Sequence, residues 1–553
     1  MPLGTFDRSD NLARLSSAPF DVLVVGGGIT GAGVALDAAS RGLRTALIER
    51  DDFASGTSSK SSKLVHGGLR YLQNGDVRLV YEALRERQRL LNNAPHLVHV
   101  LPFLIPVFSG RDGIIPKSVA RALGSAMWMY DLTGGLRIGK VHKRLKRDKA
   151  FGHMPTLDER LAWAYLYYDA QTDDARLTLT IARTAALDHG AVVLNHANVT
   201  GFRKDAGGRV VGATVEVDGR EHAVQARVVV NATGVWADDV RALDEGTHPQ
   251  SIRPAKGIHI TVPWDKVRND IAAVLPVRKD KRSIFVVPWA GPDGKIGPDG
   301  YTYVGTTDTD YDGPVDDPEC TEEDISYLLD ALNGALRTPV NRSDVIGSWA
   351  GLRPLVKAAT SGRTADLSRR HRVAASESGV ITVTGGKLTT YREMAQDTVD
   401  AAVEALGHSV DGRRIRGSRT AKMQLRGADG WERERDRDAH LARRYGSEAG
   451  VVQAMVEASP DLANPLVPGL PYRRAEAVYA VRYEMATTLD DVLSRRTRAR
   501  LLDRDATAAA ATEIADLVGA ELGWNADERS RQVAAYQAVA DKERAPIAAG
   551  PTV

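Results

Sequence analysis

Short apolar runs and helical periodicity alternate near the beginning of the chain. Residues 21–25 form an apolar run bounded by glycines, residues 31–41 have the alanine-rich periodicity of a helix, and residues 45–48 form a second apolar run. Two strands joined by a helix make a βαβ unit of about 30 residues. The pattern therefore predicts an α/β domain in this part of the chain.

The pattern changes farther along the sequence. Residues 195–230 have strand patterning with turn signals, and residues 257–308 contain several strands punctuated by Pro and Gly, which predicts antiparallel sheet in the second region. Residues 380–384 predict another strand and residues 388–406 a helix. From about residue 417 the chain is rich in Arg, Ala and Glu with helical patterning, so we expect a separate α-helical domain there.

Three shorter segments carry predictions of their own. The small polar residues of 51–62 predict a loop. Residues 81–91 predict an amphipathic helix whose charged face is solvated. The last residues, 544–553, predict a disordered tail.

The composition is that of an ordinary soluble globular protein. Of 553 residues, 43% are apolar and 26% are charged, and the length predicts two or three domains. The 73 basic and 71 acidic residues leave a formal charge of +2, which provides no field to attract nucleic acid. The single cysteine, Cys320, excludes an intramolecular disulfide framework and a multi-cysteine metal site, and favours a reducing compartment. The beginning of the chain has no signal-peptide pattern, and no uncharged apolar run reaches the ~18 residues that cross a bilayer. We therefore expect a soluble or peripherally attached protein. We also expect no bound metal.

A glycine-rich turn stands between the first predicted strand and helix. In Gly26-Gly27-Gly28-Ile29-Thr30-Gly31, the spacing of three glycines permits a tight turn, a close approach to a pyrophosphate and helix–strand packing. Backbone amides at the start of the helix then face the phosphates. Glu49, at the end of the second strand, is placed to accept hydrogen bonds from an adenosine ribose. The motif predicts a dinucleotide site, without distinguishing NAD from FAD, made by Gly26, Gly28, Ile29, Thr30, Gly31, Glu49 and Arg50.

Two later segments favour FAD. The strand of residues 228–231 runs into Ala232-Thr233-Gly234, a turn typical of flavoproteins that bind two dinucleotides. Gly385-Gly386-Lys387-Leu388-Thr389-Thr390 forms a strand-to-helix junction. A helix that begins at Leu388 would aim its amides at the flavin pyrimidine ring, where they stabilise the negative charge that develops when flavin accepts a hydride.

Several longer runs are specific enough to indicate a family. They are Thr57-Ser-Ser-Lys-Ser-Ser-Lys-Leu-Val-His66-Gly-Gly-Leu-Arg70-Tyr71-Leu72, Asp173-Asp-Ala-Arg-Leu177, Gly305-Thr-Thr-Asp308, Gly351-Leu-Arg353-Pro354-Leu355 and Gly385-Gly-Lys387-Leu-Thr-Thr-Tyr391-Arg392. Through these runs the chain resembles the FAD-dependent, aerobic-type glycerol-3-phosphate dehydrogenases over residues 20–540, the helical domain included.

The resemblance implies a Rossmann-like FAD domain of the glutathione-reductase type, and a substrate domain whose antiparallel sheet roofs the flavin. We expect the FAD domain in residues 18–100, 160–250 and 345–408, the substrate domain in 101–159 and 251–344, and the α-helical C-terminal domain in 417–543. Residues 57–66 would wrap the pyrophosphate and the edge of the isoalloxazine. The FAD contacts expected in that run and at the two later turns are Thr57, Ser58, Ser59, Ser62, Lys63, Leu64, His66, Gly67, Gly68, Ala232, Thr233, Gly234, Gly386, Lys387, Leu388 and Thr389.

The implied reaction is oxidation of sn-glycerol-3-phosphate to dihydroxyacetone phosphate by hydride transfer to flavin N5. A phosphate dianion needs cations, and the planar guanidinium of arginine binds phosphate oxygens in pairs. The resemblance places Arg353 there, with Arg70, Lys387 and the hydroxyl of Tyr71 nearby. The resemblance also points to His259, in the stretch Lys256-Gly-Ile-His259, as the residue that takes the alcohol proton. A neutral imidazole with a pKa near ~6.5 can act as a base at neutral pH. Lys387 is the rival base, because desolvation among cations lowers the pKa of a lysine.

The resemblance also implies partners. Family members are peripheral membrane enzymes that transfer electrons to quinone, usually as homodimers, which implies a cytoplasmic protein attached to the inner face of the cell membrane. Residues 116–131 contain Met127-Trp-Met-Tyr130, and residues 137–149 are rich in Lys and Arg. An apolar, aromatic patch beside a basic run suits a surface anchor. We therefore expect membrane contact through residues 116–149, although the same features also fit a core helix and a solvated basic face.

Other functions remain compatible with the sequence. A glycerol-3-phosphate oxidase would share the fold and substrate and use oxygen as acceptor. An amine or amino-acid oxidase shares the FAD domain, but the cations Arg70 and Arg353 in family-specific motifs argue against it. A non-catalytic flavin-binding scaffold is a third alternative. The sequence decides neither the electron acceptor, nor the base, nor the oligomeric state, nor the role of the C-terminal domain.

Overall fold

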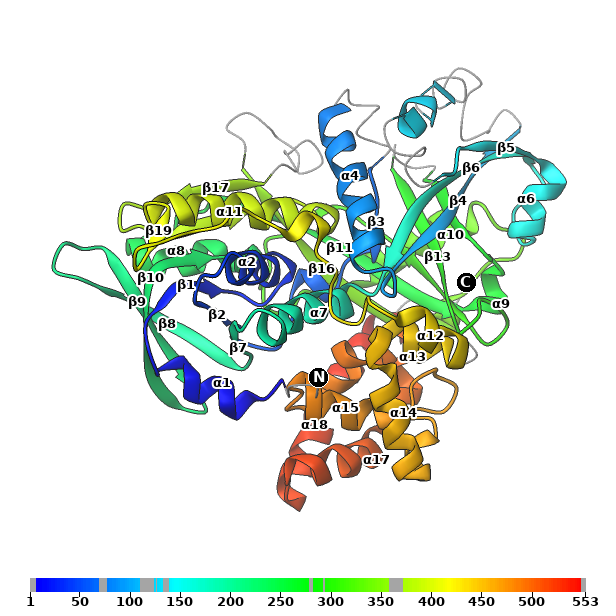
Figure 1. Ribbon diagram of the computed structural model, residues 1–553. Helices are drawn as coiled ribbons and strands as arrows, with labels where there is room; N and C mark the ends of the chain where they lie inside the picture. The colour runs from blue at the N-terminus through cyan, green and yellow to red at the C-terminus, as the bar shows by residue number, and fades with distance from the viewer. Residues whose placement is uncertain are drawn as a thin grey trace.

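The computed structural model describes residues 6–68, 77–109, 124–125, 127–132, 139–277, 282–291, 294–357 and 371–548. These residues form two large sheets, a helical domain and a small sheet of two strands, β19 (Ser409–Val410) and β20 (Arg413–Arg414). Figure 1 shows the sheet that contains β1 at the left, the sheet that contains β4, β6 and β13 at the right, and the helical domain, gold to red, at the bottom. Arg70 and Tyr71 lie outside the described residues.

The first sheet contains the predicted βαβ unit. Its strands follow the order β17-β18-β10-β1-β2-β7, so that β1 (Phe20–Val25) lies between β2 (Thr45–Ile48) and β10 (Arg220–Asn231), parallel to both. Every residue of β1 is buried, because helices cover one face of the sheet and β-strands the other. The covering helices are α2 (Ile29–Ser40), α7 (Asp174–Leu187) and α11 (Tyr391–Ala405), and the strands on the opposite side are β8 (Ala197–Lys204), β9 (Val210–Val217) and the outer part of β10.

The second sheet is mostly antiparallel, as predicted for residues 257–308. Its strands follow the order β15-β11-β14-β13-β12-β4-β6-β3, with β16 also paired to β11 and β5 to β6. Alternate residues of β11, Ile258, Ile260 and Val262, pack with the apolar face of α10 (Glu322–Asn333). Residues 257, 259 and 261 therefore face the opposite side of this sheet. The strands are β3 (Leu64–Val65), β4 (Val98–Phe108), β5 (Lys143–Lys146), β6 (Leu161–Thr172), β11 (Ile252–Pro263), β12 (Ala272–Pro276), β13 (Ser283–Trp289), β14 (Tyr301–Gly305), β15 (Thr309–Asp310) and β16 (Gly347–Val356).

Sheet pairing moves two of the expected domain boundaries. The ranges 160–250 and 345–408, assigned from the sequence to the FAD domain, begin with β6 and β16, and both strands belong to the second sheet. The reason is the length of their pairing, since β6 pairs with β4 along nearly its whole length and β16 pairs with β11 from Gly347 to Val356. The second sheet is thus larger than the sequence predicts.

The C-terminal domain is helical, as predicted. A buried core joins its longer helices, and Asp503 caps the start of α17 by accepting from the Ala506 amide at 2.9 Å. The helices are α12 (Trp431–Arg437), α13 (Ala439–Tyr445), α14 (Ala449–Ala458), α15 (Arg474–Glu484), the π-helix η11 (Asp491–Arg496), α16 (Ala499–Leu502), α17 (Arg504–Leu522) and α18 (Ala526–Ala548). The remaining elements outside this domain include α1 (Arg8–Leu15), α4 (Val77–Asn93), α6 (Arg147–His153), β7 (Val192–Leu194), α8 (Ala237–Glu245), α9 (Trp264–Val267), β17 (Arg372–Ala375), β18 (Ile381–Thr384), β19 (Ser409–Val410) and β20 (Arg413–Arg414).

Two local predictions are corrected. The expected tail at 544–553 is wrong for its first residues, because α18 continues to Ala548: Arg544 pairs with Asp505 at 2.7 Å, and Arg342 donates to the Pro546 carbonyl at 3.0 Å. The charged face of α4 is not fully solvated, because Glu86 is buried against Arg392. Both errors have the same cause, since residues distant in the sequence supply partners that local patterning does not reveal.

Among the described residues, no helix combines the length and apolar character that a bilayer span requires.

Candidate cofactor and substrate site

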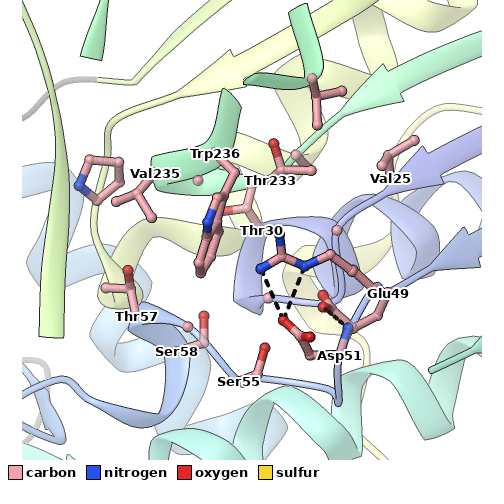
Figure 2. Close-up of a pocket in the computed structure, with 18 of the residues that line it drawn as sticks. Val25, Thr30, Glu49, Asp51, Ser55, Thr57, Ser58, Thr233, Val235 and Trp236 are labelled. Carbon is pink, nitrogen blue, oxygen red and sulfur yellow. Dashed lines mark hydrogen bonds and ion pairs between the residues drawn. The ribbon is translucent and has the colours of Figure 1, made fainter. Parts of the chain in front are cut away.

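A pocket of about 650 Å³ opens at the carboxyl ends of β1 and β2. Parallel strands commonly place ligands at this edge of a sheet, beside the start of the following helix. Figure 2 shows Glu49, Thr57, Ser58 and Trp236 around the pocket. Its lining includes these predicted residues: Gly26, Gly28, Ile29, Thr30, Glu49, Arg50, Thr57, Ser58, Ala232, Thr233, Gly234, Gly386, Lys387 and Leu388.

The glycine turn adopts the close-packed geometry that its motif predicts. Gly26 has φ +108°, a conformation that L side chains rarely adopt, and a Cβ on Gly31 would stand 1.8 Å from the Gly26 carbonyl oxygen. The Ile29 amide, at the start of α2, donates to Ser58 Oγ at 2.8 Å. The turn thus brings backbone, the N-terminal end of α2 and the loop hydroxyls into one pocket, which suits a pyrophosphate.

Glu49 lies where the sequence predicts, at the end of β2. Its carboxylate accepts from the Gly27 amide at 2.5 Å and from the Asp51 amide at 2.9 Å. Burial raises the pKa of Glu49 to about 7, against the opposite effect of these two amides. The carboxylate therefore fixes the turn and the following loop while it lines the pocket.

Part of the pocket wall was missed by the sequence analysis. The Arg50 guanidinium lies over the Trp236 ring, 5.2 Å from its centroid, and donates to the Asp316 carboxylate at 2.7 Å. Trp236 Nε1 donates to the same carboxylate at 2.7 Å. Trp236 stands two residues after the Ala-Thr-Gly turn, so its position could have been included, whereas Asp316 arrives from a distant loop. The lining residues missed in this way include Asp51, Ser55, Gly56, Ala197, Asn198, Val199, Val235, Trp236, Pro314, Val315 and Asp316.

The junction after β18 lies at the same pocket. Gly386 has φ +83°, and Lys387 and Leu388 line the pocket. The expected helix from Leu388 begins instead as a 3-10 turn, Leu388–Thr390, and becomes α-helical at Tyr391. Thr389 anchors this turn to the first predicted FAD loop, because its hydroxyl accepts from the His66 amide at 3.1 Å.

The first residues of the loop 57–68 line the pocket, and most of its later residues lie in the protein interior. The Lys63 ammonium pairs with Asp174 at 3.0 Å and donates to the Ser59 carbonyl at 3.0 Å, and this side chain is 2% exposed. Burial and nearby Arg498 lower the pKa of Lys63 to about 8. Leu64 lies buried in β3, and the Gly67 amide donates to the Tyr130 hydroxyl at 2.9 Å. The pocket lining includes none of the buried residues Ser59, Lys63, Leu64, Gly67 and Gly68.

A second cluster lies on the face of β11 that is turned away from α10. The Arg353 guanidinium lies over Gly257, and a Cβ there would stand 2.4 Å from Nη2. Arg353 donates to Asp308 at 3.2 Å and to the Thr306 hydroxyl at 3.1 Å. His259 projects from the same face two residues along the strand. Pro354, which follows Arg353, lines the pocket described above, so the cluster adjoins the pocket.

His259 is buried and held on two sides. Its Nε2 lies 2.9 Å from Ser62 Oγ, and its ring stacks on Trp349 with centroids 4.8 Å apart. Burial, together with the positive charges of Lys63 and Arg353, lowers the pKa of His259 well below its usual value. The imidazole is therefore neutral at neutral pH, and it shares its environment with Arg353. Ser62 comes from the predicted FAD loop, so tertiary structure brings that loop and the two site residues together.

Comparison with known proteins agrees with this geometry. The family model described as FAD dependent oxidoreductase matches residues 21–392, and that of the C-terminal domain of alpha-glycerophosphate oxidase matches residues 411–529. A curated glycerol-3-phosphate dehydrogenase from Mycobacterium leprae is 40% identical over 98% of this chain and 91% of its own length. The chain belongs to the FAD-dependent glycerol-3-phosphate dehydrogenase family.

Two further members of the family show how far the similarity extends. The mitochondrial glycerol-3-phosphate dehydrogenase of Mus musculus is 39% identical over 94% of this chain and 73% of its own length. The crystal structure of the Bacillus halodurans glycerol-3-phosphate dehydrogenase complexed with FAD is 31% identical, covers 98% of both chains and has a TM-score of 0.76. The Rossmann-like fold, the helical C-terminal domain and FAD as the cofactor, all predicted from the sequence, are thereby confirmed.

The residues present fit FAD. Three glycines leave backbone, not side chain, at the place where a pyrophosphate would lie. Gly26 is left-handed, Gly31 contacts the Gly26 carbonyl, and Gly28 lies beside Ser58. A Cβ at Gly28 would stand 3.2 Å from Ser58 Oγ. The glycines of this turn therefore leave the pocket open.

Proposed function

We propose that the protein oxidises sn-glycerol-3-phosphate to dihydroxyacetone phosphate, with FAD bound in the pocket and electrons passed on to a membrane quinone. The substrate is supported by the relatives, which are named as glycerol-3-phosphate dehydrogenases. The observation that carries the proposal is the placement of Arg353 of β16 and His259 of β11 on one face of the second sheet. His259 contacts Ser62, which belongs to the loop whose preceding residues line the pocket.

Arg353 is proposed to bind the substrate phosphate. Its guanidinium offers a planar set of donors and stays charged at any pH of interest. Asp308 and Thr306 orient that guanidinium. An arriving phosphate dianion would compete with the Asp308 carboxylate for the same cation. Arg70 and Tyr71 keep their proposed supporting roles and lie outside the described residues.

His259 and Lys387 are the two proposed proton acceptors. When bound, FAD supplies the two-electron acceptor for the hydride that leaves the alcohol carbon. His259 is neutral and buried, so its ring nitrogen can receive the alcohol proton, and a bound phosphate dianion would offset the nearby positive charges that lower its pKa. Lys387 lines the cofactor pocket and can hold negative charge on the substrate oxygen or take the proton itself.

The test is an anaerobic absorbance spectrum of the purified protein before and after addition of sn-glycerol-3-phosphate. We expect a bound-flavin band that bleaches with this substrate and stays unchanged with glycerol or amino acids. A band that no glycerol phosphate bleaches would refute the substrate and favour the amine-oxidase or scaffold alternative. Hydrogen peroxide formed in air at the rate of substrate oxidation would identify an oxidase instead of a quinone-linked dehydrogenase.

We also propose peripheral attachment to the inner face of the cell membrane. Trp128 is 60% and Leu132 69% exposed, and the Trp128 ring lies 5.0 Å from that of His142 in the basic stretch. Exposed apolar side chains next to lysines and arginines can bind an anionic lipid surface. Vesicles containing phosphatidylglycerol should retain the protein at low salt and release it at high salt.

Matched variants locate the contact. Trp128→Ala with Leu132→Ser should weaken vesicle binding, whereas Val211→Ser, which changes an exposed apolar residue of β9, should not. Equal binding by all of these proteins would contradict the assignment to residues 116–149. The proposed homodimer is tested separately by sedimentation equilibrium, where a single monomer mass would contradict it.

A further inference from the structure

We propose that the C-terminal domain sets the FAD affinity of the protein through Asp52, a positioning residue held by Arg495 and Arg496. The inference rests on the FAD site proposed above and assigns the helical domain a role toward that site. It is carried by the contacts of the loop of residues 49–58, which has one face in the pocket and the other on the C-terminal domain.

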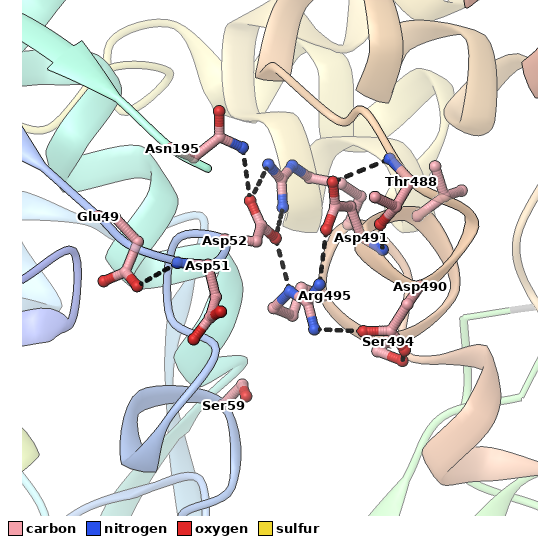
Figure 3. Close-up of polar contacts among 12 residues, drawn as sticks. Glu49, Asp51, Asp52, Ser59, Asn195, Thr488, Asp490, Asp491, Ser494 and Arg495 are labelled. Atoms are coloured by element: carbon pink, nitrogen blue, oxygen red, sulfur yellow. Dashed lines mark hydrogen bonds and ion pairs between the residues drawn. The ribbon is translucent and has the colours of Figure 1, made fainter. Parts of the chain in front are cut away.

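The two faces of this loop have different partners. Asp51, Ser55, Thr57 and Ser58 belong to the pocket lining, whereas Asp52 does not. In Figure 3, Asp52 points toward Arg495 of the C-terminal domain and Asp51 points away from it. Any shift of Asp52 would therefore be transmitted through one peptide unit to a residue of the pocket wall.

The Asp52 carboxylate is fully enclosed by donors. Arg496 donates through both terminal nitrogens, at 2.6 and 2.7 Å, and Arg495 Nε donates at 2.5 Å. Asn195 donates its side-chain amide at 2.9 Å. The side chains of Asp52 and Arg496 are 0% and 1% exposed. Two guanidinium groups from the π-helix η11 thus hold one carboxylate of the cofactor loop without access for water.

The same C-terminal segment also holds the far end of the loop. Arg498 donates to the Ser59 carbonyl and pairs with Asp174 at 3.3 Å. Ser59 directly follows Ser58, whose hydroxyl accepts from the first amide of α2. Arginines of one short segment therefore hold the loop at Asp52 and, directly after its last residue, at Ser59.

The cluster is better explained by ion pairing than by a metal ion. Asp52, His196 and Asp491 place ligand atoms within 4.8 Å of one another. However, the Asp491 carboxylate accepts from His196 at 3.0 Å and from Arg495 at 2.7 Å, while Asp52 is occupied by the arginines described above. Guanidinium groups at these oxygens leave no role for a further cation.

A buried ion pair adds little net stability, because the cost of desolvation offsets much of the attraction. Several donors converge on Asp52, which restricts the carboxylate to one place and with it the neighbouring pocket residues. We therefore expect changes at Asp52 to act on FAD binding more than changes at a comparable ion pair elsewhere between the same domains.

Glu448 provides that matched comparison. This C-terminal carboxylate is also buried between two arginines, Arg183 of α7 and Arg426, each at 2.6 Å. It joins the helical domain to the FAD domain but makes no contact with the cofactor loop. Asp52→Asn and Glu448→Gln each replace a carboxylate between two arginines by its amide.

The experiment follows flavin release and protein unfolding in the FAD-loaded full chain, by flavin and tryptophan fluorescence during heating. It also measures the FAD dissociation constant by titration of FAD-stripped protein. We expect Asp52→Asn to weaken FAD binding about tenfold and to release flavin well before unfolding. Glu448→Gln should lower both temperatures together and leave the dissociation constant near that of the wild type.

A milder variant keeps the test informative if Asp52→Asn folds poorly. Arg495→Gln leaves Asp52 paired with Arg496 and changes a side chain that is 11% exposed. An FAD affinity equal to that of wild type in Arg495→Gln or in folded Asp52→Asn would overturn the inference, as would equal effects of Asp52→Asn and Glu448→Gln. A wild-type protein that binds no FAD would overturn the proposed site itself.

Discussion

The Arg353 guanidinium occupies the space that a side chain at Gly257 would fill. A Cβ on Gly257 would lie 2.4 Å from Nη2 of Arg353 and 2.7 Å from Nη1. The two residues come from adjacent antiparallel strands, β16 and β11, whose pairing holds Ala255 opposite Arg353. Glycine at this position thus determines where the proposed phosphate-binding cation lies.

Gly257→Ala should displace Arg353 without unfolding the protein. The nearest atoms to the added methyl group are the ends of the Arg353 and Thr306 side chains, which can move while the strand stays in place. We expect kcat/KM for sn-glycerol-3-phosphate to fall about tenfold, mainly through a higher KM. Steady-state kinetics would measure this change. Gly201→Ala is the control, because its Cβ would meet nothing within 4 Å, and equal kinetics for both variants would contradict the assignment.

Arg353→Ala should cost about 3 kcal/mol of transition-state binding, the upper range for a charged hydrogen bond, which is on the order of a hundredfold in kcat/KM. Arg353→Lys should recover part of the loss, because it restores the charge without the planar fork. The loss should be absent for glycerol, which has no phosphate. An unmodified enzyme that used glycerol and glycerol phosphate equally would rule out this role of Arg353.

His259→Gln should slow flavin reduction by on the order of a hundredfold or more, because the variant removes a proton acceptor and keeps a side chain of similar size. Stopped-flow absorbance under anaerobic conditions measures that step. Lys387→Met is the comparison. If Lys387 is the base, its variant will show the larger loss and His259→Gln will reduce its flavin at nearly the wild-type rate.

The acid side of the pH profile should lack a contribution from His259. Burial and the neighbouring cations of Lys63 and Arg353 hold the pKa of His259 well below its usual value, so the free enzyme keeps a neutral imidazole as pH falls through 6.5. The pH profile of kcat/KM measures groups of the free enzyme. A wild-type acid limb near pH 6.5 that disappears in His259→Gln would show the opposite.

Glu49 should make the FAD-free protein less stable as pH rises from its usual pKa of 4.5 to about 7. In that window the folded protein holds a proton on Glu49 that the unfolded chain has released, so raising the pH favours unfolding. Thermal unfolding of FAD-stripped wild type and Glu49→Gln, compared at pH 5 and pH 8, measures this effect. We expect the wild type to lose stability relative to the variant at the higher pH, and a difference independent of pH would disprove the shift.

Local features of the sequence were sufficient to locate the cofactor turn. The order of strand, glycine turn, helix and strand requires only near neighbours, and Gly26 and Gly31 must be glycine because backbone atoms stand where their side chains would be. The flavin-type turns at Ala232 and Gly386 followed from the same kind of local signal. Both turns line the pocket together with the glycine turn that begins at Gly26.

The sequence by itself thus determined the dinucleotide fold, the family and the glycine-rich turns that line the pocket, because these depend on short-range spacing and on motifs. Tertiary structure decided which charged residues meet. Lys63 pairs with Asp174 and does not line the pocket, and Glu86 is buried against Arg392. Asp52 pairs with Arg496, which is 444 residues away in the sequence. Such pairs leave no local pattern, since a buried charge needs only a partner of opposite sign at contact distance, and any distant part of the chain can supply it.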